Sequence, residues 1–189
     1  LYLMLQEVLD GTPYGERLES AEAVIARLRG RKIPLEIERL RLAAAMAQHA
    51  WEDALSQIEP GMTEIQIATL LENAILAQGV TPAFETIVNA GAKTAPGHGA
   101  PTEARLEPGD LLHVDFGVRY HDYCSDIQRL AYFRSAGETE APQALTRAFD
   151  CIRRIVDETA SQYLPGALGR EIDALARRIL TEAGYPEYD

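Results

Sequence analysis

The chain has 189 residues, of which 18 are basic and 29 acidic, so its formal net charge is −11; 47% of its residues are hydrophobic. This length suffices for one domain with a sizeable core, or for most of a larger one. The acidic balance argues against a nucleic-acid partner, because a polyanion would be repelled and no basic patch offsets the charge. No apolar run is long enough to span a membrane, so we expect no membrane partner either.

The two cysteines, Cys124 and Cys151, show no spacing typical of a metal site or a redox motif. Such usage favours a reducing compartment, and the first residues lack the charged leader and cleavage site of a signal peptide. We therefore expect a cytoplasmic protein. The chain does not begin with methionine, which favours its interpretation as a fragment or a processed product.

The N-terminal part is predicted to be helical. Residues 1–34 form a lead-in whose short helix is capped by Ser20 and ended by Gly30. Apolar residues then recur every three or four positions over residues 35–58, which predicts a long helix with one buried stripe. The members of this stripe are Ile37, Leu40, Ala44, Ala47, Trp51 and Leu55. A capping-box pattern at residues 63–66 predicts the start of a second helix.

The rest of the chain is predicted to contain strands and then helices again. Apolar runs bounded by Gly and Pro indicate strands, and longer periodic segments indicate helices. The expected elements, in chain order, are strand 83–90, loop 91–101, a hairpin over 111–133 with its tip at 119–122, helix 141–163 and helix 170–183. This order predicts a mixed fold of the α/β (α+β) class.

Two carboxylates of the predicted hairpin form the most informative pair. If the tip is centred between Tyr120 and His121, Asp115 faces Asp126 directly, with Cβ atoms roughly 4.5–5.5 Å apart. Like charges among apolar neighbours repel each other, so this arrangement requires a bridging cation or a shared proton. We favour a metal. The simpler alternative is that Asp115 is a hydrogen-bonded carboxylate beside a turn.

The histidines differ in what their positions indicate. His98 lies between two glycines in a loop, a placement typical of ligand contacts. His113 lies two residues before Asp115 and is interpreted as a core histidine. His121 is expected to be solvated at the hairpin tip, and His49 to lie on a helix surface or in packing.

Four collinear segments resemble one known family: PGMTEIQIA, FETIVNAGAKTAPGHGAPTEARLEPGDLLHVDFG, YCSDIQR and PGALGREIDALARRILTEAGYPEY. Together they are similar to the pita-bread metallopeptidases, which include methionine aminopeptidase, aminopeptidase P and prolidase. Several motifs in order are more specific than any one of them. The resemblance implies a pita-bread fold with an incomplete second half, and it makes residues 35–189 the N-terminal part of the catalytic domain.

The resemblance also implies roles for individual residues. Asp115 would chelate one divalent metal, Asp126 would bridge two, and His98 would contact the substrate or the tetrahedral intermediate. The S-D-x-x-R run at residues 125–129 is similar to the proline-directed branch of the family, and Arg129 is given a supporting role. Gln128, inside this run, stands where a threonine is common.

The implied enzyme is a metal-dependent exopeptidase of the Xaa-Pro dipeptidase or aminopeptidase P type, with two Mn, Co or Zn ions and a small peptide substrate. The family completes its site with a histidine and two glutamates that these residues do not include. We therefore expect this polypeptide alone to be inactive or nearly so, and to bind metal weakly or not at all.

Two other functions stay open: a non-catalytic binding or scaffold protein, and a metal-independent amidinohydrolase similar to creatinase. A homodimer is also left open, because an uncovered sheet edge could pair with another copy.

Overall fold

A computed structural model of the chain describes residues 1–95 and 99–186. The chain divides into two compact units. The first comprises Leu1–Ile58, Gln66–Ile87 and Asp115–Gln128, and the second comprises Glu59–Ile65, Val88–Val114 and the residues from Arg129 onwards. Each unit is therefore built from segments that are distant in sequence. Over the described residues, no helix is long and apolar enough to cross a membrane.

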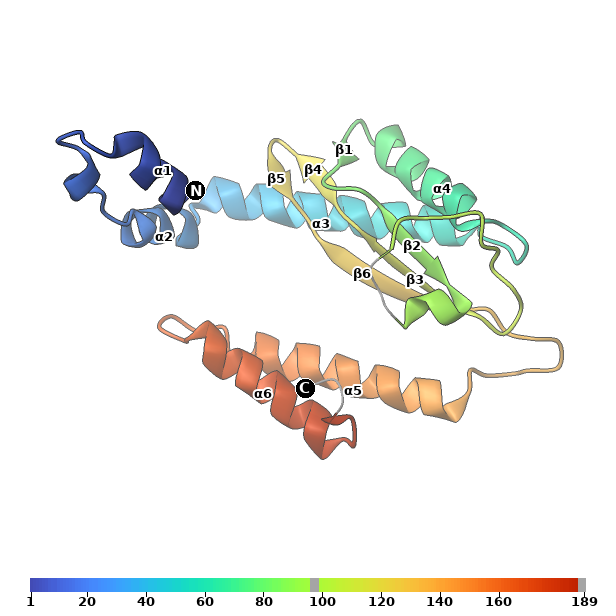
Figure 1. Cartoon of the computed structure of the whole chain (residues 1–189). Coiled ribbons are helices and arrows are strands. Elements are labelled where there is room, and N and C mark those ends of the chain that lie inside the picture. The colour runs from blue at the N-terminus through green and yellow to red at the C-terminus, as the bar shows by residue number, and fades with distance from the viewer. Residues whose placement is uncertain (96–98, 187–189) are drawn as a thin grey trace. The chain divides into compact units, whose positions relative to one another are not determined.

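From α2 onwards the helices and the hairpin follow the order predicted from the sequence (Figure 1). Helix α1 was not predicted, the expected strand 83–90 forms two short strands, and the N-cap of α2 is Ala21 and not Ser20. The helices are α1 (Tyr2–Leu9), the 3-10 turn η1 (Gly15–Arg17), α2 (Glu22–Gly30), α3 (Pro34–Leu55), α4 (Glu64–Ala77), the 3-10 turn η2 (Gly91–Thr94), α5 (Gln143–Ala160) and α6 (Gly169–Glu182). The strands are β1 (Thr81–Pro82), β2 (Ile87–Ala90), β3 (Leu111–Phe116), β4 (Val118–Tyr120), β5 (Tyr123–Cys124) and β6 (Ile127–Tyr132). They form two three-stranded sheets, ordered β1-β4-β5 and β2-β3-β6.

Helix α3 packs against β4 and β5 through a face made mostly of alanine (Figure 1). The buried residues of α3 are Ala43, Ala47, Ala50, Trp51 and Ala54. The predicted stripe was therefore right at Ala47 and Trp51 and only partly right at Leu40, which is half-buried. It was wrong at Ala44, which is exposed, and at its ends, because Ile37 and Leu55 are 39% and 37% exposed. Alanines let the helix approach the strands closely, and close packing outweighs the hydrophobicity of the larger side chains.

The start of α3 is tied to strand β5. Glu36 accepts a hydrogen bond from the Ile33 backbone N–H at 2.7 Å and another from the Tyr123 hydroxyl at 3.0 Å. The Arg39 guanidinium lies 5.5 Å from the centroid of the Tyr123 ring. These contacts lower the pKa of Glu36 below its ordinary value, with the Ile33 hydrogen bond as the largest cause. They anchor one strand of the hairpin to the helix.

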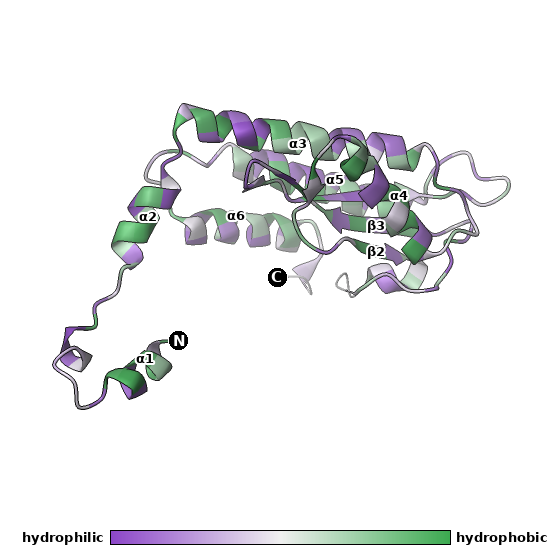
Figure 2. Ribbon diagram, turned by 90° about the horizontal axis from the view of Figure 1, so that it is seen from above, coloured by the Kyte–Doolittle hydropathy of each residue, from purple (hydrophilic) through white to green (hydrophobic). Residues whose placement is uncertain are grey.

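Helices α5 and α6 run side by side in the second unit (Figure 1). Hydrophobic and hydrophilic residues alternate along α6 (Figure 2), and α6 buries Ile172 and Ile179. Helix α5 lies within the expected range 141–163, and α6 begins and ends one residue before the expected range 170–183.

Candidate metal site

The hairpin that carries Asp115 and Asp126 turns later than predicted. Tyr120 pairs with Tyr123 and Arg119 pairs with Cys124, so His121 and Asp122 are the two residues of the turn. Both have positive φ, 47° and 65°, as a type I′ turn requires. The expected tip between Tyr120 and His121 was therefore wrong by one position. The signal that could have located it is Asp122, since Asp tolerates positive φ better than most residues.

This register changes the partner of each carboxylate. Continued along the strands, it shifts the pairing by two residues and places Asp115 opposite Gln128, so the direct facing of Asp115 and Asp126 was wrong. Side chains alternate with a period of two, so a shift of two residues keeps them on the same face. In a regular ladder Asp126 would then lie diagonal to Asp115, at roughly 7–8 Å.

The two strands approach each other unusually closely next to Asp115. A Cβ atom on Gly117 would lie 2.0 Å from the Ser125 carbonyl oxygen, so only glycine fits there. Two hydrogen bonds hold the strands at this point: the Ser125 N–H donates to the Val118 carbonyl, and the Val118 N–H donates to the Ser125 hydroxyl, both at 2.9 Å. Gly117 and Ser125 thereby connect the hairpin tip to the part that carries the carboxylates.

Asp115 is buried, and only one of its two carboxylate oxygens accepts a hydrogen bond from a described residue. It lies on β3 with 7% of its surface exposed, and its Oδ2 accepts a hydrogen bond from Gln128 Nε2 at 3.0 Å. Its Oδ1 is buried and has no hydrogen-bond partner among the residues that the structure describes. A buried carboxylate oxygen without a donor is costly. Asp115 Oδ1 is therefore suited to act as a ligand to a cation.

Asp126 lies between β5 and β6 and is exposed. Hard divalent cations prefer carboxylate oxygens, so Asp115 and Asp126 together fit such an ion. Within residues 1–95 and 99–186, no group of three or more His, Cys, Asp and Glu side chains could hold a metal. The described residues therefore supply two carboxylates to the candidate site.

The other residues singled out in the sequence are placed as follows. His113 is buried, at 8% exposure, as expected for a core histidine. His121 is exposed at the hairpin tip, and His49 is exposed and lies 3.6 Å from Asp53. Arg129 is half-buried on β6. His98 lies outside the described residues.

Sequence reasoning missed a buried carboxylate at the start of α4. Glu64 has no exposed surface and forms an ion pair with Lys93. It also accepts hydrogen bonds from the Ala90 N–H at 2.9 Å, and from the N–H and hydroxyl of Thr102 at 2.9 and 2.8 Å. Burial raises the pKa of Glu64, but these donors outweigh it and hold the pKa below its ordinary value.

One carboxylate thus binds the backbone N–H groups of both Ala90 and Thr102. The sequence signal for Glu64 was only its place in the capping-box pattern, which does not reveal burial.

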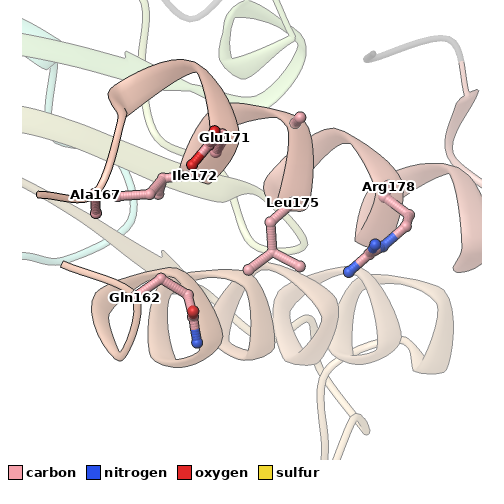
Figure 3. A pocket seen from close by; sticks show the side chains of 7 residues that line it. Gln162, Ala167, Glu171, Ile172, Leu175 and Arg178 are labelled. Atoms are coloured by element: carbon pink, nitrogen blue, oxygen red, sulfur yellow. The ribbon is translucent and has the colours of Figure 1, made fainter. Parts of the chain in front are cut away.

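A cavity of about 250 Å³ lies beside α6 (Figure 3). It is lined by Gln162, Ala167, Glu171, Ile172, Ala174, Leu175 and Arg178. Its charged side chains, Glu171 and Arg178, are both exposed. Of the predicted site residues that the structure describes, Asp115, Asp126 and Arg129, none lines this cavity.

Comparison with known proteins decides the family. Residues 38–189 match the profile described as metallopeptidase family M24. The chain belongs to this family. Its solved structural neighbours include Xaa-Pro peptidases, and the pita-bread fold and the family predicted from the sequence are thereby confirmed.

Three relatives show how far the similarity extends. An uncharacterized peptidase of Staphylococcus saprophyticus is 33% identical over 169 residues, which cover 88% of this chain and 47% of that protein. The Xaa-Pro dipeptidase of Pyrococcus furiosus is 30% identical over 174 residues, with coverages of 92% and 49%. The crystal structure of the X-Pro aminopeptidase from Thermotoga maritima has a TM-score of 0.80 at 30% identity, with coverages of 88% and 46%. The chain spans about half the length of these proteins.

Proposed function

We propose that the protein is a metal-dependent exopeptidase of the Xaa-Pro dipeptidase or aminopeptidase P type, acting on small peptides. Membership of a metallopeptidase family and the similarity to Xaa-Pro peptidases support this proposal. The single observation that supports it most is the buried Oδ1 of Asp115, which has no hydrogen-bond partner in the described part of the chain, in a hairpin that also contains Asp126. In this proposal residues 35–189 are the N-terminal part of the catalytic domain, and residues 1–34 lead into it.

Each residue of the proposed site would have a role that follows from its side-chain chemistry. Asp115 and Asp126 would hold two divalent ions, for which Mn, Co and Zn are the candidates. Such ions, when bound, act as Lewis acids on a carbonyl and acidify a water molecule. His98 would donate a hydrogen bond to the negative charge that develops on the scissile carbonyl oxygen. Arg129 would support the site by pairing with a carboxylate.

The 189-residue polypeptide by itself is proposed to be inactive or nearly so. The histidine and two glutamates that the family uses to complete its site are not among these residues, and two carboxylates leave most coordination positions to water. A peptidase assay of this polypeptide with added Mn²⁺ checks the proposal, and robust turnover would contradict it.

The decisive experiment uses the full-length protein, with an Xaa-Pro dipeptide as substrate and Mn²⁺ added. Asp126→Asn is expected to reduce kcat/KM at least about 100-fold, because it removes a charged metal ligand. The matched control is Asp122→Asn, which removes the same charge from the hairpin tip and is expected to leave kcat/KM unchanged. Equal activity of Asp126→Asn and the unsubstituted protein would refute the proposal.

Metal content separates the remaining functions. Two bound ions per chain are expected for the peptidase. A full-length protein that binds none after dialysis against Mn²⁺ would instead favour a scaffold or an amidinohydrolase of the creatinase kind.

A further inference from the structure

The side-chain amide of Gln128 donates a hydrogen bond to one of the two carboxylate oxygens of Asp115. Its Nε2 lies 3.0 Å from Asp115 Oδ2, and the two residues belong to β6 and β3 of one sheet. Both lie in the first compact unit. The contact is partly buried, so water competes with it less than at an open surface.

A single donor on Oδ2 has a geometric consequence for Oδ1. The hydrogen bond restricts rotation of the carboxylate, because turning it would break the bond and leave a second buried oxygen without a donor. With Oδ2 held by the amide, Oδ1 has a fixed direction and no hydrogen-bond partner among the described residues. One oxygen is therefore held in place and the other is left available.

The chemistry of the donor matters as much as its position. An amide N–H is neutral, so it orients the carboxylate without neutralising it. An Arg or Lys at the same place would form an ion pair and compete with a cation for the charge of Asp115. An amide partner therefore leaves the full negative charge available on the free oxygen.

We propose that Gln128 is a positioning residue that presents Oδ1 of Asp115 to a divalent cation. This inference rests on the proposed function, because it assumes that Asp115 binds metal. Partners that orient metal ligands in this way typically contribute about 10–100-fold to metal affinity.

The test is calorimetric titration of the metal-free full-length protein with Mn²⁺. Gln128→Met keeps the length of the side chain and removes the donor, and it is expected to raise the dissociation constant about 10-fold or more. Gln57→Met is the matched control, because the exposed Gln57 amide donates only to the Asp53 carbonyl of its own helix end. The control is expected to bind Mn²⁺ as the unsubstituted protein does.

A second variant and a second measurement separate positioning from folding. Gln128→Asn keeps the amide but withdraws it by one methylene, so it is expected to weaken Mn²⁺ binding as well. The urea midpoint of the metal-free Gln128→Met protein is expected to fall below that of Gln57→Met, because Asp115 Oδ2 is then buried without its donor. A cooperative unfolding transition in each variant shows that the Mn²⁺ affinity is measured on folded protein. Unchanged Mn²⁺ affinity in both Gln128 variants would overturn the inference while leaving the proposed function standing. An unsubstituted protein that binds no Mn²⁺ would overturn the proposed function and this inference together.

Discussion

Replacing Gly117 by alanine is expected to damage the hairpin severely. A Cβ atom there would lie 2.0 Å from the Ser125 carbonyl oxygen and 2.9 Å from Phe84 Cε1. Real Cβ contacts are not found below 3.0 Å, so the two strands must separate by about 1 Å or more. The obstacle is backbone, which cannot rotate away as the end of a flexible side chain could.

The magnitude follows from the contacts that separation would break. The two hydrogen bonds between Val118 and Ser125, both at 2.9 Å, would be lost, at about 1 kcal/mol each. Overpacking in a filled core costs a further 1–3 kcal/mol or so. The free energy of unfolding is therefore expected to fall by about 3–5 kcal/mol.

Urea denaturation of the full-length protein checks this value, with Gly169→Ala as the control. Gly169 is the first residue of α6, and a Cβ atom there would meet nothing within 4 Å. Alanine should be neutral at that position or stabilise it by up to about 1 kcal/mol. A loss below about 1 kcal/mol for Gly117→Ala would refute the close approach of the strands.

Two further predictions concern the turn and the buried carboxylate. Asp122→Gly is expected to raise the free energy of unfolding by about 0.5–1 kcal/mol, measured in urea, because Asp122 has a φ of 65° that glycine adopts without strain; a decrease would contradict the type I′ turn. Glu64→Gln is expected to lower the free energy of unfolding by about 2–4 kcal/mol near neutral pH. The fully buried Glu64 would lose its ion pair with Lys93 and its charge-assisted hydrogen bonds. Since the pKa of Glu64 in the folded protein lies below its ordinary value of 4.5, its contribution is complete above that pH and disappears as the pH falls further. The difference between the unsubstituted protein and Glu64→Gln should therefore shrink in urea curves recorded below pH 4.5, and a constant difference would contradict the assignment.

Local signals predicted most of the elements. Helix α6 extends from Gly169 to Glu182, against an expected 170–183, because apolar periodicity and flanking glycines act over a few residues. The expected strand 83–90 instead forms two short strands, β1 and β2. Periodicity also identified the buried face of α3 only in part: it indicated Ala47 and Trp51 but missed Ala43 and Ala54, which are fully buried. Which side of a helix is covered depends on its partner, and local pattern carries little of that information.

The candidate site was predicted in part. The sequence indicated Asp115 and Asp126 as a pair on one hairpin, and their roles as metal ligands remain a proposal. It did not indicate that Gln128 is the neighbour of Asp115. A hairpin register depends on two turn residues, and the choice of His121 and Asp122 over the preceding pair moved every cross-strand contact.

The sequence by itself determined the family and the fold class, and it indicated the two carboxylates that we propose as metal ligands. These are properties of residue identity and spacing along the chain, which motifs preserve. The tertiary structure decided which atoms meet: Gln128 with Asp115, and Glu64 with the backbone N–H groups of Ala90 and Thr102. Such contacts join positions that are far apart in sequence or depend on exact register. They follow from how the strands and helices pack, because a shift of one or two residues replaces every partner while leaving the local pattern unchanged.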